Sequence, residues 1–494
     1  MASIRSRSNN HPFIEELTDC IDAQDAFRVI KDYTWSFFLD SGINPYGLGR
    51  YSFIGSDPFL VLISRGSETS LVSRDERIYV SGNPFEILRE QLARYNIDSS
   101  RCPVPFAGGA VGYFGYDLCH FIEKLPATAT DDMMIPDCCV AFYDSVIAYD
   151  HVENKAYVVS TGLPEVDEIR RERKAGQRVE ELKQLVCSNG RSADRGHAGE
   201  KSSRLRVIES QNGAEVYSNF TRDEYIKAVE AAIEYIANGD IFQVNLSQRF
   251  ESKLPCDPYE LYLRLRGESP APFACYLNFG DVTVAGASPE RFLRVSGGRV
   301  ETRPMKGTRP RGRSPAEDEA LAAELLSSGK DRAENIMIVD LERNDLGRVC
   351  EYGSVKVDDL CTLEKYATVF QLTSTVEGKL GRGNDRIDLL KAAFPGGSIT
   401  GAPKVRAMEI IDELEPTKRG IYTGSVGYLG FDGGMDLNIV IRTFVIKGDR
   451  VCFQVGGGIV ADSDPAMEYQ ETLDKARALT AALGLKNTAG SLRS

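Results

Sequence analysis

Two residues in the second half of the chain have types and surroundings suited to covalent chemistry. Lys306 lies two residues after Pro304 and directly before Gly307-Thr308, and Glu290 follows Ser288-Pro289. A lysine on such a short, rigid segment is well placed to be held against a substrate. It can attack only as the neutral amine, so this chemistry requires its pKa to fall from about 10.4 toward the working pH. A surface or ion-paired lysine is the ordinary alternative.

Two predicted helices carry acidic residues on one face. Asp331 and Glu334 are spaced i, i+3, while Glu468, Glu471 and Lys475 are spaced i, i+3, i+7. Such faces are commonly exposed to solvent. If both instead point into one cavity, their oxygen ligands would favour Mg²⁺. The four histidines all lie in the first 200 residues, so carboxylates and lysines must carry any chemistry in the second half.

Two glycine-rich segments could approach a ligand with their backbone. Residues 394–404 lead into an apolar helix, where free amides would favour a carboxylate or another anion. Residues 456–458 are consecutive glycines before the second acidic helix. Ordinary turns are the alternative for both. Neither segment matches a Walker loop, which disfavours nucleotide binding.

Composition narrows the class of protein. The 494 residues have a net charge of −13, which argues against nucleic acid or a membrane surface as a partner. No apolar run approaches the roughly 18 residues of a membrane helix. The eleven cysteines are scattered without a C-x-x-C pair. We therefore expect reduced thiols in a cytoplasmic protein, without a zinc site.

Changes in pattern along the chain predict three parts. Residues 1–160 are strand-rich, residues 161–215 form a charged helix (165–185) and a flexible linker (188–203), and residues 216–488 form the catalytic domain. The last part starts with a capping box, Thr221 with Glu224, and a helix stopped by Gly239. A strand over 437–442 is expected to project Arg442. Helices and hairpins without a βαβ rhythm predict an α+β fold.

Four ordered motifs, at residues 239–247, 331–341, 398–404 and 468–471, resemble those of the chorismate-utilising enzymes. The resemblance covers about residues 215–485, and the first part also looks like this family's N-terminal region. It implies a large chorismate-binding fold of antiparallel sheets flanked by helices, with an N-terminal strand-rich unit packed against it.

Within that family, Lys306 occupies the Pro-x-Lys-Gly-Thr position of the branch that makes aminodeoxychorismate, where the anthranilate branch usually has alanine. Gln243 stands where the water-adding enzymes carry a lysine, and glutamine cannot deprotonate water. Asn335 also resembles the aminodeoxychorismate branch. The alternatives are the anthranilate branch and a non-catalytic subunit that regulates an amidotransferase.

The resemblance also implies a site and a reaction. Glu334 and Glu471 would hold Mg²⁺, supported by Glu468 and Asp331. Lys306 would attack C2 of chorismate while Glu290 protonates the leaving C4 hydroxyl, and ammonia would then add at C4 and expel the lysine. The product would be 4-amino-4-deoxychorismate, a precursor of 4-aminobenzoate and folate. The residues expected to bind the substrate are Gln243, Thr400, Gly401, Tyr422, Arg442, Gly456, Gly458 and Lys475.

Three further expectations concern partners and departures from the family. No glutaminase part is recognisable, so ammonia would come from a glutamine amidotransferase subunit or from free ammonium. Gln371 replaces a histidine that the family usually carries. Ser41, after Asp40, lies in a segment that resembles the tryptophan-binding element of anthranilate synthases. Tryptophan here would be a regulator or a structural ligand, and plain core packing is the alternative.

Overall fold

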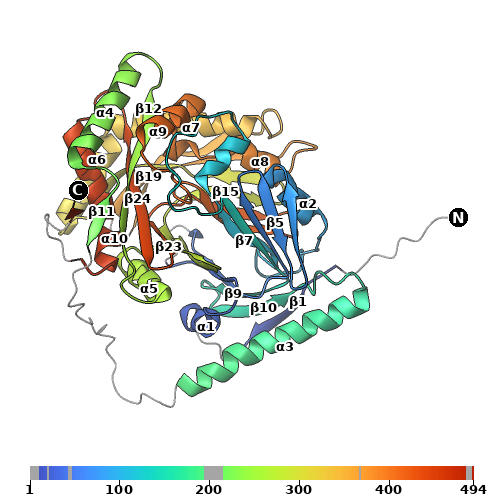
Figure 1. Cartoon of the computed structure of the whole chain (residues 1–494). Coiled ribbons are helices and arrows are strands. Elements are labelled where there is room, and N and C mark those ends of the chain that lie inside the picture. Colours follow the sequence, from blue (N-terminus) through green and yellow to red (C-terminus); the bar gives the residue numbers. More distant parts are fainter. Residues whose placement is uncertain are drawn as a thin grey trace.

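Two large, mainly antiparallel sheets form the centre of the protein, with helices around them (Figure 1). The computed structural model describes residues 10–18, 22–42, 47–193, 215–366, 369–485 and 492–493. Within these residues the sheets have 13 and 12 strands. The predicted α+β fold of antiparallel sheets flanked by helices is confirmed.

The first sheet runs in the order β1 (Phe13–Leu17), β10 (Lys155–Ser160), β9 (Ser145–Asp150), β3 (Tyr51–Gly55), β2 (Ser36–Asp40), β13 (Phe273–Phe279), β14 (Val282–Ser288), β23 (Thr443–Lys447), β24 (Arg450–Ile459), β12 (Gln243–Lys253), β11 (Val216–Ser218) and β25 (Leu492–Arg493), with β20 (Gly401–Ala402) beside β12. The second runs β17 (Met305–Pro310), β19 (Val369–Lys379), β16 (Arg299–Thr302), β15 (Arg291–Ser296), β22 (Met435–Asn438), β21 (Ser425–Gly430), β7 (Gly109–Phe114), β8 (Cys138–Tyr143), β4 (Leu60–Arg65), β5 (Glu68–Val72) and β6 (Arg77–Ser81), with β18 (Lys356–Lys365) beside β19.

Strands from before and after residue 160 share both sheets. β2 pairs with β13 in the first sheet, and β7 pairs with β21 in the second. A large hydrophobic core packs side chains from both sheets together. The strand-rich N-terminal part therefore extends the sheets of the C-terminal part instead of forming a sheet of its own.

The helices cover the outer faces and ends of the sheets (Figure 1). Their bounds are α1 (Ala23–Ile30), α2 (Pro84–Ala93), α3 (Glu168–Ala193), α4 (Arg222–Ala237), α5 (Pro258–Glu268), α6 (Pro315–Ser327), α7 (Gly329–Gly347), α8 (Arg386–Ala393), α9 (Lys404–Leu414) and α10 (Pro465–Ala482), with short 3-10 turns at Tyr116–Phe121 and Gly397–Ile399. α7 packs against β17, β18 and β19, α10 packs against β24, α4 and α5, and α9 packs against β12. The helices α7, α9 and α10 bring the acidic motifs and the loop 394–404 to the strands.

Local signals read from the sequence placed both ends of α4 correctly. Thr221 and Glu224 form a capping box at the start of α4, and Gly239 follows its end with a φ of 82°. Asp464 caps α10 by accepting a hydrogen bond from the Met467 amide. None of the helices in the described part of the chain is long and apolar enough to cross a membrane.

Two predicted boundaries were wrong. α3 continues to Ala193, so residues 188–193, which were expected in the linker, are helical. The one glycine in this stretch, Gly190, lowers the stability of the helix without ending it. Residues 194–203 of that predicted linker lie outside the described residues. The strand predicted over 437–442 ends at Asn438, because residues 439–442 cross from β22 in the second sheet to β23 in the first.

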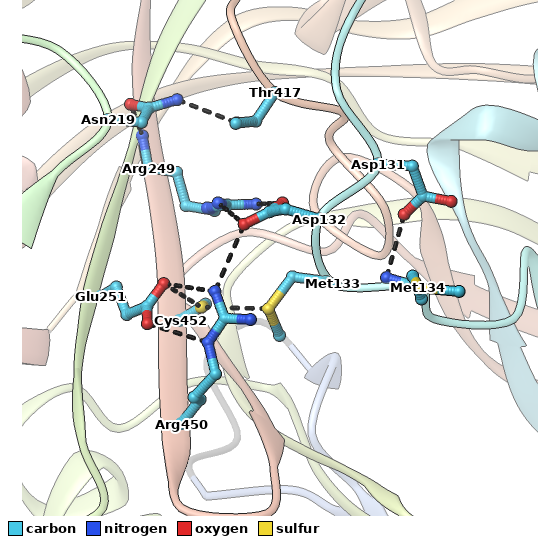
Figure 2. A network of polar contacts seen from close by, with 10 residues as sticks. All are labelled: Asp131, Asp132, Met133, Met134, Asn219, Arg249, Glu251, Thr417, Arg450 and Cys452. Carbon is cyan, nitrogen blue, oxygen red and sulfur yellow. Dashed lines mark hydrogen bonds and ion pairs between the residues drawn. The ribbon is translucent and has the colours of Figure 1, made fainter.

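A segment around Asp132 contacts one end of the antiparallel β12–β24 pair, where Lys253 lies opposite Arg450 (Figure 2). Arg249 of β12 donates two hydrogen bonds to Asp132, at 2.8 and 2.6 Å. Arg450 of β24 binds Glu251 of the neighbouring strand and also reaches Asp132 at 3.3 Å. These charged residues hold this half of the strand pair in place. The other half carries the three consecutive glycines.

Candidate functional site

The glycines of β24 allow acidic side chains to lie directly against the strand. A Cβ on Gly458 would stand 2.1 Å from Gln243 Nε2 and 2.9 Å from Glu334 Oε1. A Cβ on Gly457 would stand 3.1 Å from Glu468 Oε2. Any side chain here would displace these groups. The structure thus brings α7 and α10 to the same strand end, as their acidic faces suggested.

Lys306 of β17 lies next to Glu334 in this set of acidic residues. Its Nζ lies 3.0 Å from Glu334 Oε1, and its side chain is 12% exposed. A β-bulge follows it, with Gly307 at a φ of 73°. A Cβ on Gly307 would come within 3.0 Å of the Asp331 Cβ. Glycine at this position therefore lets the strand pass close to α7, so that Lys306 faces Glu334.

Two carboxylates and two lysines form one charged cluster. Burial would raise the pKa of Glu334, but Lys306 and Gln243, which donates to it, lower the pKa overall. Lys475 lies 2.8 Å from Glu471 Oε1 and lowers the pKa of that carboxyl. Glu334 and Glu471 also interact electrostatically. Both acids are therefore held ionised by neighbouring ammonium groups.

The two remaining acids of the predicted metal site have other partners. Glu468 is buried and accepts a hydrogen bond from Ser463 Oγ at 2.6 Å, and burial raises its pKa. Asp331 accepts one from Arg309 Nη2 at 3.1 Å. The described residues contain no ready-made cluster of three or more metal ligands. Ligands that are all oxygen atoms suit Mg²⁺. In this structure the positive charge beside Glu334 and Glu471 comes instead from Lys306 and Lys475.

Glu290 is a buried carboxyl on the turn between β14 and β15. Burial raises its pKa to about 7, although Ser398 and Lys306 oppose the shift. Ser398 Oγ donates to its Oε1 at 2.7 Å. A carboxyl with this pKa is still partly protonated at neutral pH and can act as a general acid. Ser398 lies in the motif 398–404, but the sequence did not distinguish it as a site residue.

The loop 394–404 is tied to β12 by its backbone. Gly401 pairs with Val244, and the Asn245 amide donates to Thr400 O at 2.7 Å. The Thr400 hydroxyl is completely buried and donates to Gly396 O at 2.9 Å. The Thr400 hydroxyl therefore uses its proton within the loop, and only its lone pairs could accept from a substrate.

Arg419 is a residue that sequence reasoning missed. It forms a buried ion pair with Glu415 and donates to Ile399 O at 3.0 Å and Asn245 O at 2.6 Å. Its guanidinium also lies 5.8 Å from the Tyr422 ring. It therefore joins β12, the loop 394–404 and Tyr422, which are far apart in sequence. A charged residue in a turn gives no sequence signal of such a role.

Several polar groups lack a counter-ion or a hydrogen-bond partner in the described part of the protein. Arg442, at a φ of 51°, donates to Ser269 Oγ at 3.4 Å and has no ion pair among the described residues. Burial lowers its pKa. In the same described part, the side-chain oxygens of Gln243, Asn245 and Gln371 are buried without a hydrogen-bond partner. An uncompensated guanidinium suits an anionic group of a ligand, and the unsatisfied oxygens suit a hydrogen-bond donor such as a hydroxyl or a water.

Ser41, the candidate tryptophan-site residue, lies elsewhere. It lines a cavity of about 290 Å³ with Tyr51 and Phe53, and none of the acidic cluster lines this cavity. The Ser41 hydroxyl donates to Tyr51 O at 2.5 Å. Asp40 is engaged by Tyr262 and Arg266. The cavity has room for a ligand, and tryptophan binding stays a prediction.

Comparison with known proteins agrees with this geometry. A family model described as chorismate binding enzyme matches residues 41–481. The chain is 40% identical over 469 residues to anthranilate synthase component 1 of Acetivibrio thermocellus, covering 94% of this chain and 93% of that protein. It is 39% identical over 445 residues to aminodeoxychorismate synthase component 1 of Bacillus subtilis (strain 168), covering 90% and 92%.

A solved structure shows the same likeness. Anthranilate synthase component I from Streptococcus pneumoniae TIGR4 superposes with a TM-score of 0.75 at 34% identity, covering 87% of this chain and 92% of that one. The family match spans most of the chain, including both acidic helices, Lys306 and the glycine-rich strand. The chain therefore belongs to the family of chorismate-binding enzymes.

Proposed function

We propose that the protein aminates chorismate at C4 to give 4-amino-4-deoxychorismate through an intermediate bound to Lys306. The observation that carries this proposal is a largely buried lysine in contact with Glu334 and electrostatically coupled to Glu290, a carboxyl whose pKa burial raises to about 7. These are the groups that the reaction requires: a nucleophile and an acid for a leaving hydroxyl. A relative named aminodeoxychorismate synthase component 1 supports it.

The reaction balances with these two residues. Lys306 Nζ forms a bond to C2 as the ring double bonds shift and the C4–O bond breaks. Glu290 gives its proton to the departing oxygen, so water leaves. Ammonia then bonds to C4, the double bonds shift back, and the C2–N bond to Lys306 breaks. The surplus proton on the new amine returns to Glu290. The enolpyruvyl group is retained throughout, and both residues are regenerated.

The remaining residues would bind the substrate and Mg²⁺. Glu334 and Glu471 would hold the ion, with Glu468 and Asp331 in support. When bound, it would orient a substrate carboxylate and neutralise charge. Arg442, which has no protein counter-ion among the described residues, would bind a second carboxylate. The residues left to position the ring are Gln243, Thr400, Gly401, Tyr422, Gly456, Gly458 and Lys475.

Ammonia would be supplied by a glutamine amidotransferase subunit. The names of the relatives, each a component 1, support a two-component enzyme. The product would then serve the synthesis of 4-aminobenzoate and folate.

A second candidate is the anthranilate synthase reaction, in which ammonia enters at C2 and pyruvate is eliminated. It is favoured by the relative of that name with 40% identity and by the S. pneumoniae structure. Lys306 disfavours it, because a lysine that bonds to C2 would block the position where ammonia must enter.

Mass spectrometry of the products distinguishes the two. The purified chain would be incubated with chorismate, Mg²⁺ and high ammonium, without a partner. We expect a product that retains the enolpyruvyl carbons. Anthranilate with an equal amount of pyruvate would overturn the proposal in favour of the second candidate. If the chain alone shows no turnover, the same assay is repeated with glutamine and an amidotransferase subunit, and failure there rejects both.

A further inference from the structure

Asn335 is a fully buried amide next to Glu334 on α7. Its side chain has 0% exposure. Its Nδ2 donates to Leu372 O at 3.4 Å, and its Oδ1 accepts from Ser374 Oγ and, at 3.5 Å, from Cys361 Sγ. The amide thus uses both its donor and its acceptor to join the helix to the sheet.

The strand that Asn335 contacts, β19, pairs with the strand that carries Lys306, β17. Leu372 of β19 is the ladder partner of Lys306 on β17. The Ser374 amide, two residues further along β19, donates to Pro304 O at 3.1 Å. Asn335 therefore contacts the ladder directly opposite the candidate nucleophile. Glu334, one residue earlier on the same helix, forms the ion pair with Lys306 Nζ.

The sheet is irregular on both sides of this contact. β17 bulges after Lys306, and β18 bulges between Asp359 and Thr362. Cys361, in the second bulge, has a φ of 53°, and its amide donates to Ser374 Oγ at 2.9 Å. A left-handed conformation at a non-glycine residue is costly and persists only where its surroundings hold it. The Asn335–Ser374–Cys361 contacts provide those surroundings.

From this geometry we infer that Asn335 is a positioning residue that sets where Lys306 lies relative to Glu334; the inference rests on the proposed function. Asn335 does not touch the reacting atoms. It acts by fixing the separation of β17 and α7, and a displacement of about 1 Å at a reacting group can cost on the order of a hundredfold in rate. A buried amide that only satisfies its neighbours would affect stability without this selective effect on rate.

Asn335→Asp is the direct test, because it keeps the shape and the acceptor but loses the donor to Leu372 O. Ser374→Ala is the second variant, since it removes the donor to Asn335 Oδ1. Asn278→Ala is the matched control. Asn278 lies on β13, and its Nδ2 also donates to a backbone oxygen, Lys31 O, at 3.1 Å. For each we would measure Tm, chorismate affinity, kcat and the products.

We expect Asn335→Asp to lower kcat at least about tenfold, at temperatures well below its Tm, while chorismate affinity changes less than about twofold. Ser374→Ala should show a smaller loss of the same kind, and Asn278→Ala should change only Tm. Unchanged kcat, or equal losses of kcat and affinity, would overturn the inference. If Asn335→Asp does not fold, Ser374→Ala decides by the same criteria. Wild-type protein that makes no C4-aminated product would instead overturn the proposed function.

Discussion

Lys306 Nζ lies 3.0 Å from Glu334 Oε1, so the candidate nucleophile and a candidate metal ligand are counter-ions of one another. The contact joins β17 to α7 in the middle of the site. A divalent cation at Glu334 would replace the lysine as the counter-charge, which links release of the amine to binding of the ion.

Removal of Mg²⁺ is therefore expected to abolish turnover. Glu334→Gln and Glu471→Gln should each lower activity at least about tenfold and raise the Mg²⁺ concentration needed for half-maximal rate. Asp474→Asn is the control, because this acid lies on α10 but bonds to Arg477 and Gln470 outside the cluster. Full activity in EDTA would contradict the assignment of a metal.

Lys306→Ala and Lys306→Arg should both lose C4 amination by on the order of a hundredfold or more. Arginine keeps a positive charge beside Glu334 but does not deprotonate in proteins, so it cannot attack. Lys379→Ala, at an exposed ion pair on β19, serves as the control. Amination at the wild-type rate in Lys306→Arg would show that the lysine acts only through its charge.

The pH profile should report Glu290. As a general acid it must be protonated, so kcat is expected to fall as pH rises through about 7. Ser398→Ala removes a hydrogen bond that lowers this pKa, and should move the falling limb to higher pH. Glu290→Gln should be slow at every pH and lack the limb. A limb that persists in Glu290→Gln would belong to another group.

Glu342 should make stability depend on pH. It is buried on α7, accepts from Thr302 Oγ1 at 2.8 Å, and burial raises its pKa to about 8 from an ordinary 4.5. Between pH 4.5 and about 8 this carboxyl is ionised in the unfolded chain but protonated in the folded protein. The free energy of unfolding therefore falls as pH rises through this range. Urea unfolding should show Glu342→Gln more stable than wild type at pH 8, by on the order of a few kcal/mol, and similar near pH 4.5. An equal difference at both pH values would contradict this.

Breaking the Arg419–Glu415 pair should be costly. Both side chains are almost fully buried, and removing one partner of such a pair costs about 3–5 kcal/mol of unfolding free energy. Arg419→Met is therefore expected to destabilise strongly, and to raise KM because Arg419 holds the backbone at Ile399 and Asn245. Arg406→Met, at a partly exposed pair with Glu409, should cost less than about 1 kcal/mol. Equal losses in denaturant unfolding would rule out the special role of Arg419.

Local chemistry in the sequence determined the features that depend on neighbours along the chain. The capping box at Thr221 and the Asp464 cap follow from side chains that reach backbone amides within one helical turn. The i, i+3 spacing of Asp331 and Glu334 likewise follows from the helical period. The ordered motifs were sufficient to indicate the family and the alternating strands to indicate an α+β fold.

Tertiary structure decided everything that depends on distant segments. The 3.0 Å contact of Lys306 with Glu334 and the approach of α7 and α10 to Gly458 and Gly457 need packing across both sheets. The crossing at residues 439–442 follows from which sheet each strand joins, and alternating hydrophobicity does not encode that choice. The pKa of Glu290, like that of Glu342, is set by burial. Spacing along a chain specifies which faces residues share, but the exclusion of water that gives those residues their chemistry arises only when separate elements pack together.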